Sequence, residues 1–179
     1  MDIRVKILEA AVQVFMRFGV GRTRMGDIAE QAGLVRQTLY TVYKNKDEIL
    51  RATILHVAAR SLGELQNDWS EQDHLTDHLE SYYQRAIYPS YAVISASPEA
   101  RDMVGGYNEV GRQAVAEAQN CKIQAWVDVM TAKAVSDPEN LARYIVLGAL
   151  GLRDLAGSKE DLEVLLAVHK RAVVELAAH

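Results

Sequence analysis

Apolar residues recur at helical spacing through nearly the whole of this 179-residue chain. Within residues 2–18, for example, Ile3, Ile7, Val14 and Phe18 fall on one helix face, at the spacing of an amphipathic helix. No segment alternates strictly between apolar and polar residues and is bounded by hairpin turn signals, as a half-buried strand would be. The chain is therefore predicted to be all-α, with about nine helices.

The helix boundaries follow from capping residues, glycines and prolines. We expect helices over residues 2–18, 23–31, 35–43, 47–67, 73–96, 107–134, 138–157 and 159–177, and a short one from Pro98, each end being accurate to about two to four residues. Gly19 suits the C-cap of the first helix, and Thr23 the N-cap of the second. The helix over residues 73–96 is expected to bend near Pro89.

Charge is unevenly divided along the chain. Residues 1–46 hold eight Lys or Arg against four acidic residues, whereas residues 47–179 hold twelve against twenty. Such asymmetry favours a polyanionic partner for the basic segment. A single cysteine, Cys121, allows no internal disulfide, and neither a signal peptide nor a membrane-spanning run is evident. We therefore expect a cytoplasmic protein with no membrane partner.

Residues 23–41 have the pattern of a helix-turn-helix. Ala29 is small enough for two helices to approach closely, and Gly33 tolerates the positive φ of the turn. Ile28, Leu34 and Leu39 are expected to form the small core between the helices. The outward side chains of the second helix, Arg36, Gln37, Thr38, Tyr40 and Thr41, could reach phosphates and base edges in a major groove.

A longer pattern surrounds this motif. Its residues are Phe15, Gly19-Val20, Thr23, Asp27-Ile28-Ala29, Ala32-Gly33-Leu34, Thr38-Leu39-Tyr40 and the run from Tyr43 to Leu50. This pattern resembles the N-terminal signature of the tetracycline-repressor (TetR) family over about residues 5–55. The resemblance implies a three-helix DNA-binding domain over residues 1–46 and an all-helical ligand-binding and dimerisation domain over residues 47–179.

The resemblance also implies roles for individual residues. Tyr40, Lys44 and Lys46 correspond to phosphate contacts, Thr38 to a backbone or base contact, and Arg36 and Gln37 to positions that read bases. The full predicted DNA-binding set is Thr23, Arg24, Arg36, Gln37, Thr38, Tyr40, Thr41, Lys44 and Lys46. Two residues depart from the family pattern: Val35 stands where Ser or Thr often caps the recognition helix, and Gly26 where a longer polar residue is preferred.

Aromatic residues are concentrated in the middle of the chain. We predict that Trp69, Tyr82, Tyr83, Tyr107 and Trp126, with the polar Asn108, bind a ligand. Because no inward-facing cation is evident, the pattern favours an uncharged or weakly cationic inducer that is hydrophobic and aromatic. Ordinary core packing explains the same aromatics and remains open. No cofactor is expected.

Two further patterns predict no metal site and no catalytic site. His74 and His78 lie one helical turn apart and could ligate zinc or nickel, but a third ligand is not evident, so no metal site is predicted. No glycine loop for phosphate, no Gly-x-Ser-x-Gly and no other catalytic motif is present, so no catalytic residues are expected and the chain is not predicted to be an enzyme.

The last two expected helices each carry an apolar stripe. In residues 138–157 it comprises Leu141, Ile145, Gly148, Ala149, Leu152 and Leu155, and in residues 159–177 Leu162, Leu165, Leu166, His169, Val173 and Leu176. These stripes could pair with a second copy or form an internal core. Together the patterns predict a homodimeric, ligand-responsive repressor that a small hydrophobic molecule releases from a palindromic double-stranded DNA operator. The alternative is a helical binding protein that sequesters a ligand or protein partner without reading DNA.

Overall fold

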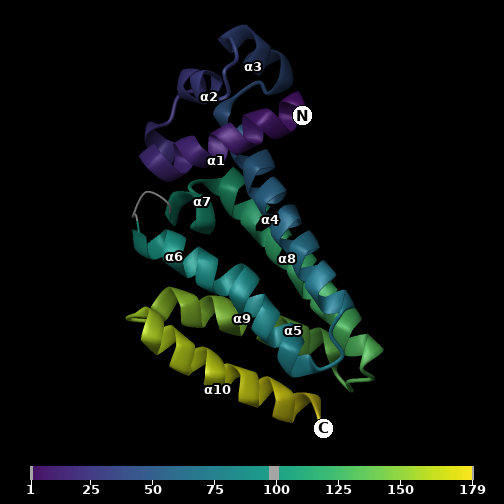
Figure 1. The fold of residues 1–179 in the computed structure, drawn as a ribbon. Coiled ribbons are helices and arrows are strands. Elements are labelled where there is room, and N and C mark those ends of the chain that lie inside the picture. The colour runs from purple at the N-terminus through teal and green to yellow at the C-terminus, as the bar shows by residue number, and fades with distance from the viewer. Residues whose placement is uncertain (1, 97–100, 179) are drawn as a thin grey trace. The chain divides into compact units, whose positions relative to one another are not determined.

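The computed structural model describes residues 2–96 and 101–178, which form helices and no strands (Figure 1). The elements are α1 (Ile3–Arg22), α2 (Met25–Gln31), α3 (Arg36–Val42), α4 (Lys46–Ser70), α5 (Leu75–Tyr82), a π-helical segment η1 (Tyr83–Ile87), α6 (Tyr88–Ala96), α7 (Arg101–Gly105), α8 (Glu109–Ala132), α9 (Pro138–Leu155) and α10 (Lys159–Ala177). With α5, η1 and α6 counted as one interrupted helix, the described residues form nine helices. The all-α prediction is therefore confirmed.

Local signals set several of these boundaries. Asp137 caps α9, whose first residue is Pro138, and the Ser158 hydroxyl caps α10 by accepting from the backbone N–H of Asp161 at 3.1 Å. Gly19 has a φ of +75° and interrupts α1 near its end, so it supplies the left-handed residue that the sequence predicted there. The predicted start of a short helix at Pro98 lies outside the described residues.

The helix predicted over residues 73–96 is interrupted by a π turn. Pro89 lacks an N–H and crowds the carbonyl four residues earlier, that of Arg85. The π-helical segment η1 ends two residues before Pro89, and the Ser61 hydroxyl donates to the Arg85 carbonyl at 3.5 Å. Where the sequence predicts a bend near Pro89, the structure thus has a widened turn that begins at Tyr83.

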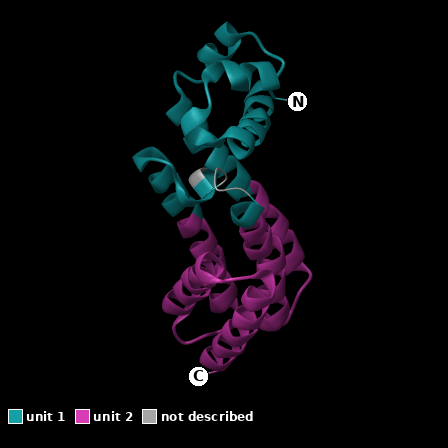
Figure 2. Ribbon diagram, turned by 90° about the vertical axis from the view of Figure 1, so that its left-hand side faces the viewer, with its two compact units in different colours: residues 1–59, 93–118 teal, residues 60–92, 119–179 magenta. Residues whose placement is uncertain are grey.

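The chain forms two compact units (Figure 2). Unit 1 comprises residues 1–59 and 93–118, and unit 2 comprises residues 60–92 and 119–179. Helices α4, α6 and α8 each contribute residues to both units. These units divide the chain differently from the predicted domains, 1–46 and 47–179, because the start of α4 and segments from α6 to α8 belong to unit 1.

Each unit has its own hydrophobic core. In unit 1 this core joins α1, α2, α3 and the first turns of α4, and its fully buried side chains include Ile7, Phe15, Ile28, Leu39 and Leu50. The core of unit 2 is built from the end of α4, α5, η1, the end of α8, α9 and α10. Within the described part of the chain, no helix is both long and apolar enough to cross a membrane.

Candidate functional site

Helices α2 and α3 pack as the helix-turn-helix that the sequence predicts. Gly33 has a φ of +60°, and the backbone N–H of Leu34 donates to the Ala29 carbonyl at 2.9 Å, which closes the turn between the helices. Ile28, Ala29 and Leu39 are buried in the core of unit 1, while Leu34 is half-buried against it. This packing leaves the opposite face of α3 for contacts with a partner.

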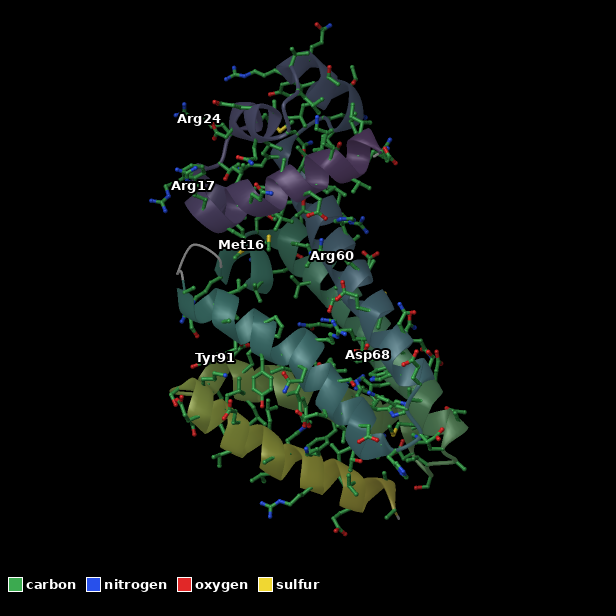
Figure 3. The ribbon with its side chains drawn as sticks, in the orientation of Figure 1. Met16, Arg17, Arg24, Arg60, Asp68 and Tyr91 are labelled. Carbon is green, nitrogen blue, oxygen red and sulfur yellow. The ribbon has the colours of Figure 1, made fainter. Side chains whose placement is uncertain are left out.

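The exposed face of α3 carries most of the predicted DNA-binding residues. Arg36, Gln37, Tyr40 and Thr41 are exposed, as is Lys44 just after the helix. Thr38 is half-buried, and its carbonyl accepts a hydrogen bond from the Thr41 hydroxyl at 2.6 Å. Arg24 is exposed at the start of α2 and labelled in Figure 3. Two donors that suit base edges, Arg36 and Gln37, thus lie beside groups that suit phosphates.

The two departures from the family pattern differ in their consequences. Val35 is the N-cap of α3, is exposed, and provides no side-chain hydrogen bond to the helix. Gly26, by contrast, lies under the Arg36 guanidinium: a Cβ at residue 26 would overlap Arg36 Nη2 and lie 2.7 Å from its Nε. The glycine therefore leaves the space in which the Arg36 side chain crosses α2.

This packing predicts the effect of Gly26→Ala. Alanine favours the helix by up to about 1 kcal/mol over glycine, so we expect the protein to fold with equal or greater stability. The new methyl group must, however, displace the Arg36 guanidinium, so base preference at the operator position that Arg36 reads should change. Binding to a set of single-base operator variants measures this.

Gly63→Ala is the matched control, because a Cβ at that helical glycine meets no atom within 4 Å. The control should stabilise the protein and leave base preference unchanged. If Gly26→Ala also leaves preference unchanged, the position of Arg36 over α2 does not matter for reading DNA.

Two predicted DNA contacts are occupied within the protein. Thr23 is only 3% exposed, and its hydroxyl donates to the Gly19 carbonyl at 2.7 Å. The prediction that Thr23 caps the second helix is wrong: the N-cap is Arg24, whose backbone N–H donates to the Asp27 carboxylate at 2.8 Å. Because this hydroxyl is already hydrogen-bonded to a carbonyl near the end of α1, it is poorly placed to contact DNA.

Lys46 has a similar internal role. Its Nζ donates to the carbonyls of Val20, Gly21 and Thr23 at 2.7, 3.2 and 3.1 Å. An ammonium has three donors, so these bonds use all of them. Lys46 therefore ties the start of α4 to the end of α1, whereas the neighbouring Lys44 remains exposed. Sequence reasoning grouped the two lysines because nothing local distinguishes them.

The predicted ligand residues separate into two groups. Tyr107 and Asn108 belong to unit 1, where the Tyr107 ring lies against Gly21 and the Asn108 amide donates to Asp47 at 2.8 Å. Trp69, Tyr82, Tyr83 and Trp126 all lie in the core of unit 2. The structure thus brings together four of the six predicted residues.

The four aromatic rings of unit 2 pack in contact. The centroids of Trp69 and Trp126 are 4.5 Å apart, and Tyr82 meets Trp126 edge-on at 5.8 Å. Tyr83 donates from its hydroxyl to His169 Nδ1 at 2.7 Å, and burial lowers the pKa of that imidazole. Tyr91, labelled in Figure 3, packs against the same core. A ligand here would meet an aromatic surface.

Two cations missed by sequence reasoning lie in the same unit. Lys122, on α8, is half-buried, and the Arg153 side chain, on α9, is only 9% exposed. The positive charge of Arg153 acts on both Lys122 and Tyr82. The premise of the uncharged-inducer prediction, that no cation faces inward, is therefore wrong. Lys122 precedes Trp126 by four residues, so helical spacing alone could have placed both side chains on one face of this helix.

His74 and His78 do not form an open pair. His78 is buried, its Nδ1 donates to the His74 carbonyl at 2.8 Å, and its ring lies 5.7 Å from that of Trp69. His74 is exposed at the start of α5. Among the residues that the structure describes, no three His, Cys, Asp or Glu side chains gather as metal ligands would.

Comparison with known proteins places the N-terminal segment. Residues 7–53 match the family described as bacterial regulatory proteins, tetR family. The HTH-type transcriptional regulator TtgR of Pseudomonas putida is 37% identical over 76 residues, which are 41% of this chain and 36% of that protein. AcrR of Shigella flexneri is 31% identical over 68 residues, 38% of this chain and 31% of that protein. The matches thus span about a third of these relatives.

Solved structures match over nearly the whole chain. GusR of Salmonella enterica has a TM-score of 0.71 at 21% identity, covering 99% of this chain and 96% of that one. FadR of Bacillus subtilis, solved in complex with stearoyl-CoA, has a TM-score of 0.70 at 19% identity, covering 96% and 98%. At these identities the likeness establishes the fold. Residues 7–53 thus match the tetR family of bacterial regulatory proteins, and nearly the whole chain shares the fold of these solved structures.

Proposed function

We propose that this protein is a ligand-responsive transcriptional repressor that binds a palindromic DNA operator as a homodimer. The observation that carries the proposal is the exposed face of α3, where Arg36, Gln37 and Tyr40 project from a closed helix-turn-helix with Lys44 beside them. Arginine and glutamine can donate to base edges in a major groove, and lysine and tyrosine can contact phosphates. Operator binding would take place in the cytoplasm.

The dimer is supported by apolar side chains on the last two helices. The stripes predicted from sequence mostly serve the internal core, since Leu141, Ile145, Leu162, Leu166 and Val173 are buried within unit 2. The large apolar side chains exposed on α9 and α10, of which only Leu155 and Leu176 belong to those stripes, are Tyr144, Leu147, Leu155, Val164, Val168 and Leu176. Exposed apolar surface of this kind favours association with a second copy. A dimer that reads two half-sites one helical turn apart would need recognition helices about 34–36 Å apart.

Ligand response is assigned to unit 2. Its aromatic core offers a binding surface, and α4 and α8 each continue from unit 2 into unit 1. FadR, which has this fold, was solved with stearoyl-CoA bound, so the fold can hold a small molecule. Ligand binding that shifts α4 would oppose DNA binding through a coupling free energy of about 1–3 kcal/mol.

The test of DNA binding uses Lys44. Lys44→Met removes an exposed cation beside α3, so we expect weaker binding to all DNA sequences alike and a salt dependence reduced by about one unit of slope. Fluorescence anisotropy at several salt concentrations measures both. Exposed Lys159 on α10 provides the control, Lys159→Met, which should leave the slope unchanged. An unchanged slope for Lys44→Met contradicts the proposed orientation on DNA. No DNA binding by the wild-type chain favours the sequestering alternative.

A further inference from the structure

The core of unit 2 contains two hydrogen-bond donors without acceptors. Tyr82 is 0% exposed, and neither its hydroxyl nor Trp126 Nε1 has a hydrogen-bond partner within the described part of the chain. Buried polar atoms are satisfied in the great majority of cases, so each exception calls for an explanation. The two rings are in edge-on contact, with centroids 5.8 Å apart, so the side chains that carry these donors are neighbours in the core.

Two cations adjoin this region. Lys122 precedes Trp126 by four residues on α8, so both side chains leave the same helix face. Burial lowers the pKa of the Lys122 ammonium, and the positive charge of Arg153 lowers it further. Among the described residues, no carboxylate pairs with Lys122. The Arg153 guanidinium, almost entirely buried, donates to the Ser90 hydroxyl at 3.4 Å and pairs with Asp154 at 2.7 Å.

The chemistry of these groups selects the ligand. Lysine, arginine and the indole N–H can only donate, and the Tyr82 hydroxyl also has a proton to give. Asp154 pairs with Arg153, and its side chain is 53% exposed, so the charge of Lys122 stays unbalanced among the described residues. A carboxylate oxygen from a ligand would satisfy the unpartnered donors and balance the remaining charge. An amine or an uncharged hydrocarbon would do neither.

We propose that Tyr82, Lys122, Trp126 and Arg153 form the binding site for the carboxylate of a small amphipathic acid, whose apolar body packs against the rings of Trp69 and Trp126. The assignment deepens the proposed function by naming the chemical class of the inducer. Only the release of DNA on ligand binding rests on the proposed function. The assignment replaces the uncharged or weakly cationic inducer expected from sequence, because that expectation assumed no inward cation.

The test compares acids with their uncharged amides. Calorimetric titration of the full chain would use 4-phenylbutyrate with 4-phenylbutyramide, and octanoate with octanamide. We expect each acid to bind at least about tenfold more tightly than its amide. Lys122→Met should bring that ratio close to one, whereas Lys159→Met, which removes an exposed charge from the same unit, should leave it unchanged. Equal binding of acid and amide, or no binding by either pair, overturns the proposal.

Tyr82→Phe provides a second test that a purely structural role would fail. Deleting an unpartnered buried hydroxyl should raise Tm by about 2–4 °C, while the affinity for the acid falls several-fold. A lower Tm would mean that the hydroxyl has a partner within the protein, and an unchanged acid affinity would mean that it does not meet the ligand. Either result contradicts the assignment of Tyr82.

DNA binding is measured separately on the same variants. Selective acid binding by a chain that binds no DNA would leave the ligand class intact and overturn the proposed function. Specific DNA binding by a chain that does not distinguish acid from amide would leave the proposed function intact and overturn the ligand class.

Discussion

A protein carrying Leu147→Glu and Val168→Glu should be monomeric and bind the operator about 10²–10⁴-fold more weakly than the wild type. Leu147 on α9 and Val168 on α10 are about half exposed, in the apolar set proposed for the dimer contact. A charge at each position must be desolvated to form that contact and has no partner there. Without dimerisation the second recognition helix no longer binds as part of the same molecule, which accounts for the size of the loss.

The measurement pairs light scattering after gel filtration with operator anisotropy. Ser136→Glu with Ala178→Glu adds the same charge at exposed positions outside α9 and α10 and should remain dimeric. If the Leu147/Val168 variant stays dimeric, the contact lies on another surface. If it is monomeric and binds DNA as tightly as before, dimerisation is not needed for operator binding.

Lys46→Met should destabilise the protein by about 1.5–3 kcal/mol. The substitution keeps the length of the side chain but removes the ammonium that donates to Val20, Gly21 and Thr23. Those carbonyls lie at the end of α1, where helix carbonyls lack intrahelical partners. The loss follows from hydrogen bonds to a charged group that nothing nearby replaces.

Lys44→Met is the matched comparison, since it lies two residues away and is exposed. It should change stability by no more than about 0.5 kcal/mol while reducing the salt dependence of DNA binding. Denaturant unfolding of both variants separates the two roles. Equal stability of Lys46→Met and the wild type would show that the three carbonyl contacts contribute little and would restore Lys46 as a phosphate contact.

The sequence predicted most helices because their ends carry local signals. Asp137 caps α9 just before Pro138 and Ser158 caps α10, and both side chains accept a hydrogen bond from a backbone N–H three residues later. The π turn from Tyr83 to Ile87 has no such signal, because Pro89 alone does not specify how the helix adjusts. Helix periodicity was therefore sufficient to predict the all-α fold, but it could not predict the π turn.

Side-chain roles were less predictable where they depend on distant contacts. Lys46 binds carbonyls 23 to 26 residues earlier in the chain. Arg153 acts on Tyr82 and Lys122, which come from other helices. Leu155 fitted the predicted apolar stripe of its helix, yet as the last residue of α9 it is 85% exposed. Periodicity identifies an apolar face but not which surface covers it.

The most direct test of the central claim is anisotropy of the intergenic DNA beside this gene, titrated with the full chain. The account predicts binding at least about 10³-fold tighter than to scrambled DNA of equal length, centred on an inverted repeat. Gln37→Ala should relax preference at a single position per half-site, by about 1–3 kcal/mol. Equal binding to intergenic and scrambled DNA, or binding that Gln37→Ala weakens uniformly across all single-base variants, would contradict the account of α3 as the element that reads the operator.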